Sequence, residues 1–138
     1  MSLAQRRMVK SFQDEKLPKL TEEINEAAGF DVPMEVDWAK IGKDVFEHNP
    51  TLFEEAVTKV YFLPLIEALK EIGSDDMGKE ALQAGLKKVE CKNTKNQWME
   101  QAISFKDGTL LIDHGPVMHV GKVDERKAII VKKLENGL

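Results

Sequence analysis

The sequence has 138 residues, of which 42% are hydrophobic and 32% are charged, as in an ordinary soluble domain. A chain of this length buries roughly two-thirds of its unfolded surface, so one core suffices without a disulfide or a metal. The net charge is −4 and no basic patch interrupts the mixture of charges, which argues against binding to nucleic-acid phosphates.

The cysteine content and the lengths of the apolar runs bear on where in the cell the protein is located. Cys91 is the one cysteine, so no disulfide forms within the chain and a reducing compartment is the simplest assumption. No apolar run approaches the roughly 20 residues that a membrane-spanning helix needs, and the first residues contain no apolar signal-peptide segment. We therefore expect a cytoplasmic protein that does not contact membranes.

The first third of the chain is predicted to form helix, then strand, then helix. Residues 4–28 place apolar side chains three to five positions apart, and Pro18 inside this stretch predicts a kink or a restart. Residues 30–38 alternate between apolar and polar, which predicts a short strand, and Pro33 favours an edge position. Asp37 is suited to cap a short helix that follows.

The middle of the chain predicts a buried helix. Asn49-Pro50-Thr51 is a helix-start signal, and residues 60–66 are apolar nearly all round, as in a helix surrounded by core. Pro64 should kink or divide this helix. Ser74 is then expected to cap another short helix.

Strands are predicted late in the chain. One covers residues 86–92, a second ends at Phe105, and a third spans residues 109–113. Asp107-Gly108 joins the last two as a tight hairpin, because its turn needs positive φ at both positions. Residues 125–136 favour a helix capped by Asp124, although their Ala-Ile-Ile-Val centre leaves a strand open.

This order of elements predicts the α+β class. We expect a single domain over residues 1–138, with a small antiparallel sheet of three to four strands late in the chain and helices packed on one face.

The hairpin also fixes a register. If Lys106 faces Thr109, the core face of the sheet carries the apolar residues Ile103, Phe105, Leu110 and Ile112, with His114 at its end. Asp113 then points to the opposite, solvated face.

The segment Asp113–Val120, DHGPVMHV, holds two of the three histidines and raises the question of a metal. Asp113 and His114 point to opposite faces, and no established metal-ligand spacing occurs, so we expect a turn with no metal and no cofactor. A site made of His114, His119 and Cys91 stays as the less favoured alternative.

A catalytic pair of Cys91 and His114 is also disfavoured. With strands in sequential order, the two residues lie two strand spacings apart, about 9.6 Å, whereas proton transfer needs roughly 2.6–3.2 Å. Cys91 is then a small buried hydrophobic residue.

No motif identifies a function, so two hypotheses are carried. The first is a non-catalytic interaction or binding module. The alternative is a small-molecule-binding protein or an enzyme, which uses a cavity between the kinked helices and the sheet near Tyr61, Cys91 and His114. Whether the chain is an enzyme stays open at this point.

Two apolar residues are expected on the otherwise polar face of the sheet. Trp98 should lie there near Lys92, and Leu111 should lie opposite Ser104. Exposed tryptophan is a frequent interface anchor, and symmetric dimers are the commonest oligomers. We therefore expect a protein partner or a homodimer contact centred on Trp98 and Leu111.

Overall fold

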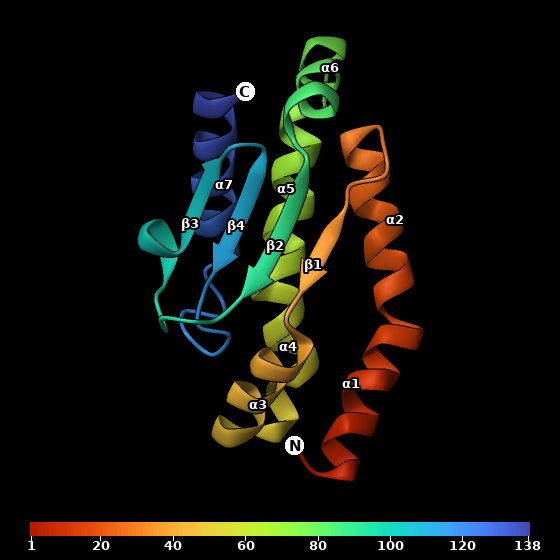
Figure 1. Ribbon diagram of the computed structural model, residues 1–138, viewed down its shortest axis with the longest axis vertical. Coiled ribbons are helices and arrows are strands. Elements are labelled where there is room, and N and C mark those ends of the chain that lie inside the picture. The colour runs from red at the N-terminus through yellow and green to blue at the C-terminus, as the bar shows by residue number, and fades with distance from the viewer.

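A four-stranded sheet lies against a layer of helices in the computed structural model, which describes residues 1–138 (Figure 1). The strands are β1 (Met34–Val36), β2 (Lys88–Lys92), β3 (Ile103–Lys106) and β4 (Thr109–Asp113). Their order in the sheet is β1-β2-β4-β3, with β1, β2 and β4 mutually parallel and β3 antiparallel to β4. The predicted α+β class is confirmed, whereas the sheet is mixed rather than antiparallel.

The mixed order has its cause in the connection between β2 and β3. The prediction placed these two strands side by side, but the segment Asn93–Ala102 carries the chain past the position that β4 later fills. β4 therefore pairs with both neighbours, and Cys91 of β2 lies opposite Ile112 of β4. The short helix η3 (Met99–Ala102) occupies residues that were predicted as strand. Cys91 therefore lies one strand spacing from β4, whereas the sequential strand order predicted two strand spacings.

The helices begin and end largely where local signals place them. Their bounds are α1 (Leu3–Glu15), α2 (Leu17–Ala28), α3 (Trp38–His48), α5 (Leu63–Ile72), α6 (Asp76–Gly85) and α7 (Val123–Gly137). Pro18 lies in the first turn of α2, and the Asp37 side chain caps α3 by accepting from the Lys40 N–H at 3.1 Å. Asp75, not Ser74, caps α6.

The final segment is helix α7, which settles the alternative between helix and strand. Its N-cap is Lys122, so Asp124 lies in the first turn instead of capping the helix. A carboxylate there still interacts favourably with the helix dipole.

Where Pro64 was predicted to kink or divide the central helix, the helix instead passes through a π-helical turn just before this residue and continues. It comprises η1 (Pro50–Leu52), α4 (Phe53–Val57), the π-helical turn η2 (Thr58–Phe62) and α5. The Leu63 N–H bonds to the Thr58 carbonyl, five residues back, and Pro64 has no N–H to offer. The carbonyl of Lys59 is therefore left without a helical partner.

One continuous core of 29 buried residues joins the helices to the sheet. The predicted hairpin register is confirmed, since Phe105 pairs with Leu110 and Ile103 with Ile112. In Figure 1, α5 and α7 lie against the same face of the sheet. No helix is both long and apolar enough to cross a bilayer.

The opposite face of the sheet carries no helix layer. Its residues on β2 are partly exposed and charged, whereas the alternate residues Val89 and Cys91 point into the core. Lys92 and Glu90 form an ion pair on this open face at 3.0 Å. The alternation explains why the helices cover one face only.

Candidate functional site

The carboxyl ends of β1, β2 and β4 meet at one edge of the sheet, because the three strands are parallel. Open sheets with parallel strands commonly bind ligands in the crevice outside these ends. Two loops leave the sheet there: residues 93–98 after β2 and residues 114–122 after β4. They touch where the Gly115 N–H donates to the Gln97 carbonyl at 2.7 Å.

A cleft of about 680 Å³ opens between these two loops and helix α3. We call it the carboxyl-edge cleft. Eight of its ten lining residues are polar or charged, and the other two are neighbours in the loop after β4. The lining residues are Lys40, Asp44, Glu47, His48, Asn93, Thr94, Lys95, Asn96, Pro116 and Val117.

A hydrogen-bonded network centred on Asn93 holds the cleft together. The Asn93 side chain is nearly buried, at 4% exposed, and donates from Nδ2 to Asp44 Oδ2 at 2.8 Å. Its Oδ1 accepts from the backbone N–H of Asn96 at 3.0 Å. Lys40 Nζ lies 2.7 Å from both oxygens of Asp44. Helix α3 and the loop after β2 are therefore tied to each other.

Asp113 anchors the same loop from the end of β4, which corrects a prediction. The residue was expected on the solvated face, but it is 6% exposed. It accepts from the Thr94 N–H at 2.7 Å and from the Thr94 hydroxyl at 2.5 Å. The direct pairing of β2 with β4 brings Thr94 over Asp113, and the sequential strand order had hidden this contact.

Arg126 on α7 is fully buried and has no carboxylate partner. Instead its guanidinium donates to the carbonyls of Lys59 at 3.1 Å, His119 at 3.2 Å and Val120 at 3.1 Å. Burial lowers the pKa of Arg126 to about 10, so the side chain stays charged at neutral pH. It thereby fastens the loop after β4 to the π-helical turn.

Sequence reasoning missed Arg126, although a signal was present. Ile130 and Leu134 follow it at intervals of four, and both are fully buried. Residues four apart share one helix face, so an arginine in this series points into the core. The roles of Asp44 and Asn93 carried no comparable signal, because their contact joins segments 49 residues apart.

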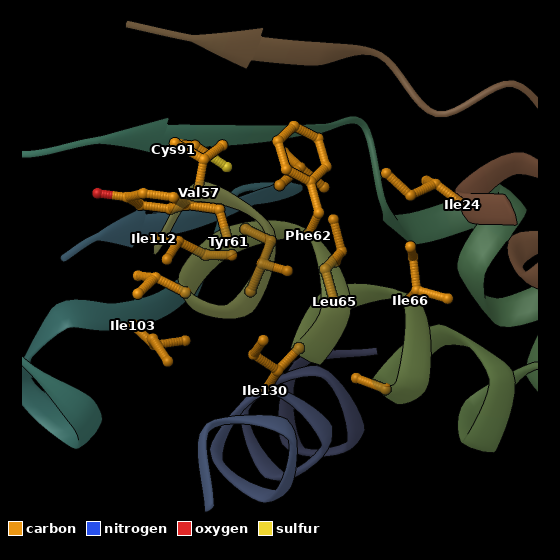
Figure 2. Close-up of a cluster of buried hydrophobic side chains, with 14 of the residues drawn as sticks. Ile24, Val57, Tyr61, Phe62, Leu65, Ile66, Cys91, Ile103, Ile112 and Ile130 are labelled. Atoms are coloured by element: carbon orange, nitrogen blue, oxygen red, sulfur yellow. The ribbon is translucent and has the colours of Figure 1, made fainter. Parts of the chain in front are cut away.

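The residues predicted to bind a ligand, Tyr61, Cys91 and His114, come together in the core. Tyr61 lies beside Cys91 beneath the sheet (Figure 2), and its hydroxyl donates to the His114 carbonyl at 2.5 Å. All three are at most 1% exposed, and none lines any of the five main cavities. Their role in ligand binding stays a prediction.

Burial also removes the ordinary acid–base chemistry of this trio. It raises the pKa of the Cys91 thiol to about 12, so the thiolate nucleophile is absent at neutral pH. It lowers the pKa of His114 to about 4, so the imidazole is neutral there. The pKa of Tyr61 is raised well above its usual value for the same reason.

The two histidines of the DHGPVMHV segment have different environments. His114 is buried, with Nδ1 2.7 Å from the Gly115 carbonyl oxygen, whereas His119 is exposed. Nowhere does the chain gather three or more histidine, cysteine, aspartate or glutamate side chains that could hold a metal ion.

Trp98 and Leu111, the predicted interface residues, lie on different features. Trp98 is 44% exposed but precedes η3 outside the sheet, so its expected position beside Lys92 on the sheet face is wrong. Its ring centroid lies 6.0 Å from that of His119. Leu111 is half-buried on the open face opposite Ser104, as expected. A partner contact or a homodimer through them stays a prediction.

Backbone strain gathers in the two loops that leave the carboxyl edge. Four non-glycine residues have positive φ, and three of them, Asn96, Met99 and His119, lie in or directly after these loops. The fourth is Asp107 in the hairpin turn. Such conformations cluster at functional sites when the surrounding contacts hold them. The strain therefore points to the same edge of the sheet as the cleft.

No family model, curated protein or solved structure matches this chain. The fold and the site define its class: an α+β domain with a polar cleft at the carboxyl edge of its parallel strands.

Proposed function

We propose that the chain is a non-catalytic binding module that takes a small polar ligand in the carboxyl-edge cleft. The observation that carries this proposal is a cleft of about 680 Å³ whose polar lining is fixed from beneath by nearly buried Asn93 and Asp113. Ligand sites are usually of roughly 300–1,000 Å³.

The network beneath the cleft supports binding because it positions the lining before any ligand arrives. Asn93 and Asp113 each make two contacts that fix the loop after β2. A ligand then does not need to order this loop, and avoiding that entropy cost raises affinity.

Binding is favoured over catalysis by the location of the reactive groups. An active site needs convergent titratable groups that substrate can reach. The four groups with the largest pKa shifts are buried and line none of the five main cavities; they are Tyr61, Cys91, His114 and Arg126. The alternative of an enzyme with an internal cavity between the kinked helices and the sheet has correspondingly less support.

The proposal includes a reducing compartment such as the cytoplasm and a ligand other than nucleic acid. Cys91 is buried and unpaired, which suits a protein that makes no disulfide. The net charge of −4 disfavours phosphate backbones.

Nuclear magnetic resonance tests the proposal directly on this 15.6 kDa chain. The ¹⁵N-labelled protein is titrated with a library of small polar metabolites, and backbone amide shifts are followed. We expect at least one compound to shift amides of residues 93–96, 116–117 and the second half of α3. The groove along α7 near Lys127 and Glu135 serves as an internal control and should not respond.

Either of two results would overturn the proposal. One is a library in which no compound produces saturable shifts. The other is saturable shifts confined to a different surface, such as the α7 groove.

A further inference from the structure

The lining of the carboxyl-edge cleft is balanced in charge. The positive charges of Lys40 and Lys95 equal in number the negative charges of Asp44 and Glu47. The cleft therefore favours neither an anion nor a cation overall. Lys40 and Asp44 also neutralise each other directly, with Nζ 2.7 Å from both carboxylate oxygens. A ligand that carries a net charge gains little from such a surface, and exposed charges are further screened by salt.

The uncommitted groups of the cleft both donate and accept hydrogen bonds. The side-chain amide of Asn96 makes no hydrogen bond within the chain. Only the backbone N–H of this residue is bonded. The Thr94 hydroxyl gives its proton to Asp113 and keeps its lone pairs. Glu47 is about two-thirds exposed, with its nearest cation, Lys43, 4.0 Å away.

Two of the backbone donors among the lining residues of the loop after β2 are already committed within the chain. The N–H of Thr94 is bonded to Asp113, and the N–H of Asn96 is bonded to Asn93. Phosphate sites generally need several free N–H groups or uncommitted cations converging on one point. Here Lys95 is the one lysine of the lining without an ion-pair partner.

We propose that the ligand is a neutral polyhydroxylated molecule, a monosaccharide or a sugar alcohol. This inference rests on the proposed function and names its ligand class. Each hydroxyl of such a molecule donates and accepts at once, which matches the Asn96 amide, the Glu47 carboxylate and the Thr94 hydroxyl. Pro116 and Val117 supply the apolar part of the lining, and such carbon atoms suit the C–H face of a sugar ring.

The test compares ligands that share one ring and differ in charge. Glucose, galactose, mannose and mannitol are titrated by amide-shift mapping beside glucuronate, glucosamine and glucose 6-phosphate. Zwitterionic amino acids form a further set, and maltotriose tests whether the sugar is the end of a glycan or a free molecule. We expect saturable cleft shifts from at least one neutral compound, with at least tenfold weaker binding by its charged derivatives.

Two variants probe the contacts without disturbing the fold. Asn96→Gly removes the amide, and glycine tolerates the φ of 50° that Asn96 adopts. It should weaken sugar binding about tenfold, as expected for the loss of one hydrogen bond to the ligand. Glu47→Gln leaves the lining with net positive charge, so the affinity for glucuronate relative to glucose should rise a few-fold. Asn136→Ala on α7 is the matched control and should leave affinity unchanged.

The outcomes separate the two proposals. Cleft binding by charged derivatives or amino acids alone would overturn the ligand class and leave the binding function standing. Unchanged sugar affinity in Asn96→Gly would overturn the class as well. If no compound, charged or neutral, shifts the amides of the cleft, the result would count against the binding function itself.

Discussion

Arg126 donates a hydrogen bond to the carbonyl oxygen of Lys59, 67 residues earlier in the chain, at 3.1 Å. That carbonyl is free because the Leu63 N–H bonds to Thr58 and Pro64 has no N–H. Buried backbone carbonyls are almost always paired, so the guanidinium supplies the donor that proline removes. The π-helical turn and the loop after β4 are thereby joined through one side chain.

Replacing Arg126 with methionine should destabilise the fold. The change leaves the partly buried carbonyls of Lys59, His119 and Val120 without their donor, and a fully buried group left unsatisfied costs roughly 1–3 kcal/mol. Removal of a buried charge that lacks a counter-ion offsets part of that loss. We expect the free energy of unfolding to fall by about 2–4 kcal/mol, as measured by urea denaturation.

Arg7→Met on α1 is the control for this experiment, because Arg7 is exposed. Its effect should stay within about 0.5 kcal/mol, as for ordinary surface changes. Equal stabilities of the two variants would show that water or a shifted backbone satisfies the three carbonyls without the guanidinium.

The parts of the fold that local signals determine were predicted from sequence. Asp107-Gly108 adopts positive φ at both positions, 52° and 81°, and the pairing of Phe105 with Leu110 follows from the turn alone. The burial of His114 follows from the same alternation. Each of these features depends on residues close in sequence, where turn geometry and side-chain period leave few alternatives.

The parts that depend on distant pairing were not predicted. The neighbour of β2 is β4, and nothing within residues 88–92 distinguishes β4 from β3 as a partner. Because the strand order was predicted to be sequential, the positions predicted for Asp113 and Trp98 were also wrong. The carboxyl-edge cleft could not be predicted for the same reason, since it needs three parallel strands whose ends meet.

Asp113 provides a sharp test of the observed strand order. A solvated aspartate would be nearly silent on substitution, but Asp113 accepts two hydrogen bonds from Thr94. Asp113→Ala should therefore lower the free energy of unfolding by about 2–3 kcal/mol, since hydrogen bonds to charged groups contribute roughly 1.5–3 kcal/mol. Urea denaturation measures the loss, with the exposed Asp31→Ala as the control. A silent Asp113→Ala would contradict the contact between β4 and the loop after β2.

His114 should make the stability of the fold depend on pH in a mildly acidic range. Burial lowers the pKa of its imidazole from 6.5 to about 4, and the charge on Arg126 acts in the same direction. Between these values the unfolded chain binds a proton that the folded chain does not, so stability rises with pH there. The stability that depends on the neutral state of His114 is fully present above about pH 6.5 and is lost as the pH falls towards 4. At 1.36 kcal/mol per pKa unit, the total is roughly 3 kcal/mol.

The measurement is urea denaturation between pH 4 and pH 7.5 for the wild type and for His114→Asn. Carboxylates that titrate in this range are common to both proteins, so the difference in slope isolates His114. We expect wild-type stability to fall more steeply below pH 6.5 than that of His114→Asn, whatever the absolute stability of the variant. Parallel curves would mean that His114 titrates alike in the folded and unfolded chain, which a fully buried imidazole beside Arg126 should not do.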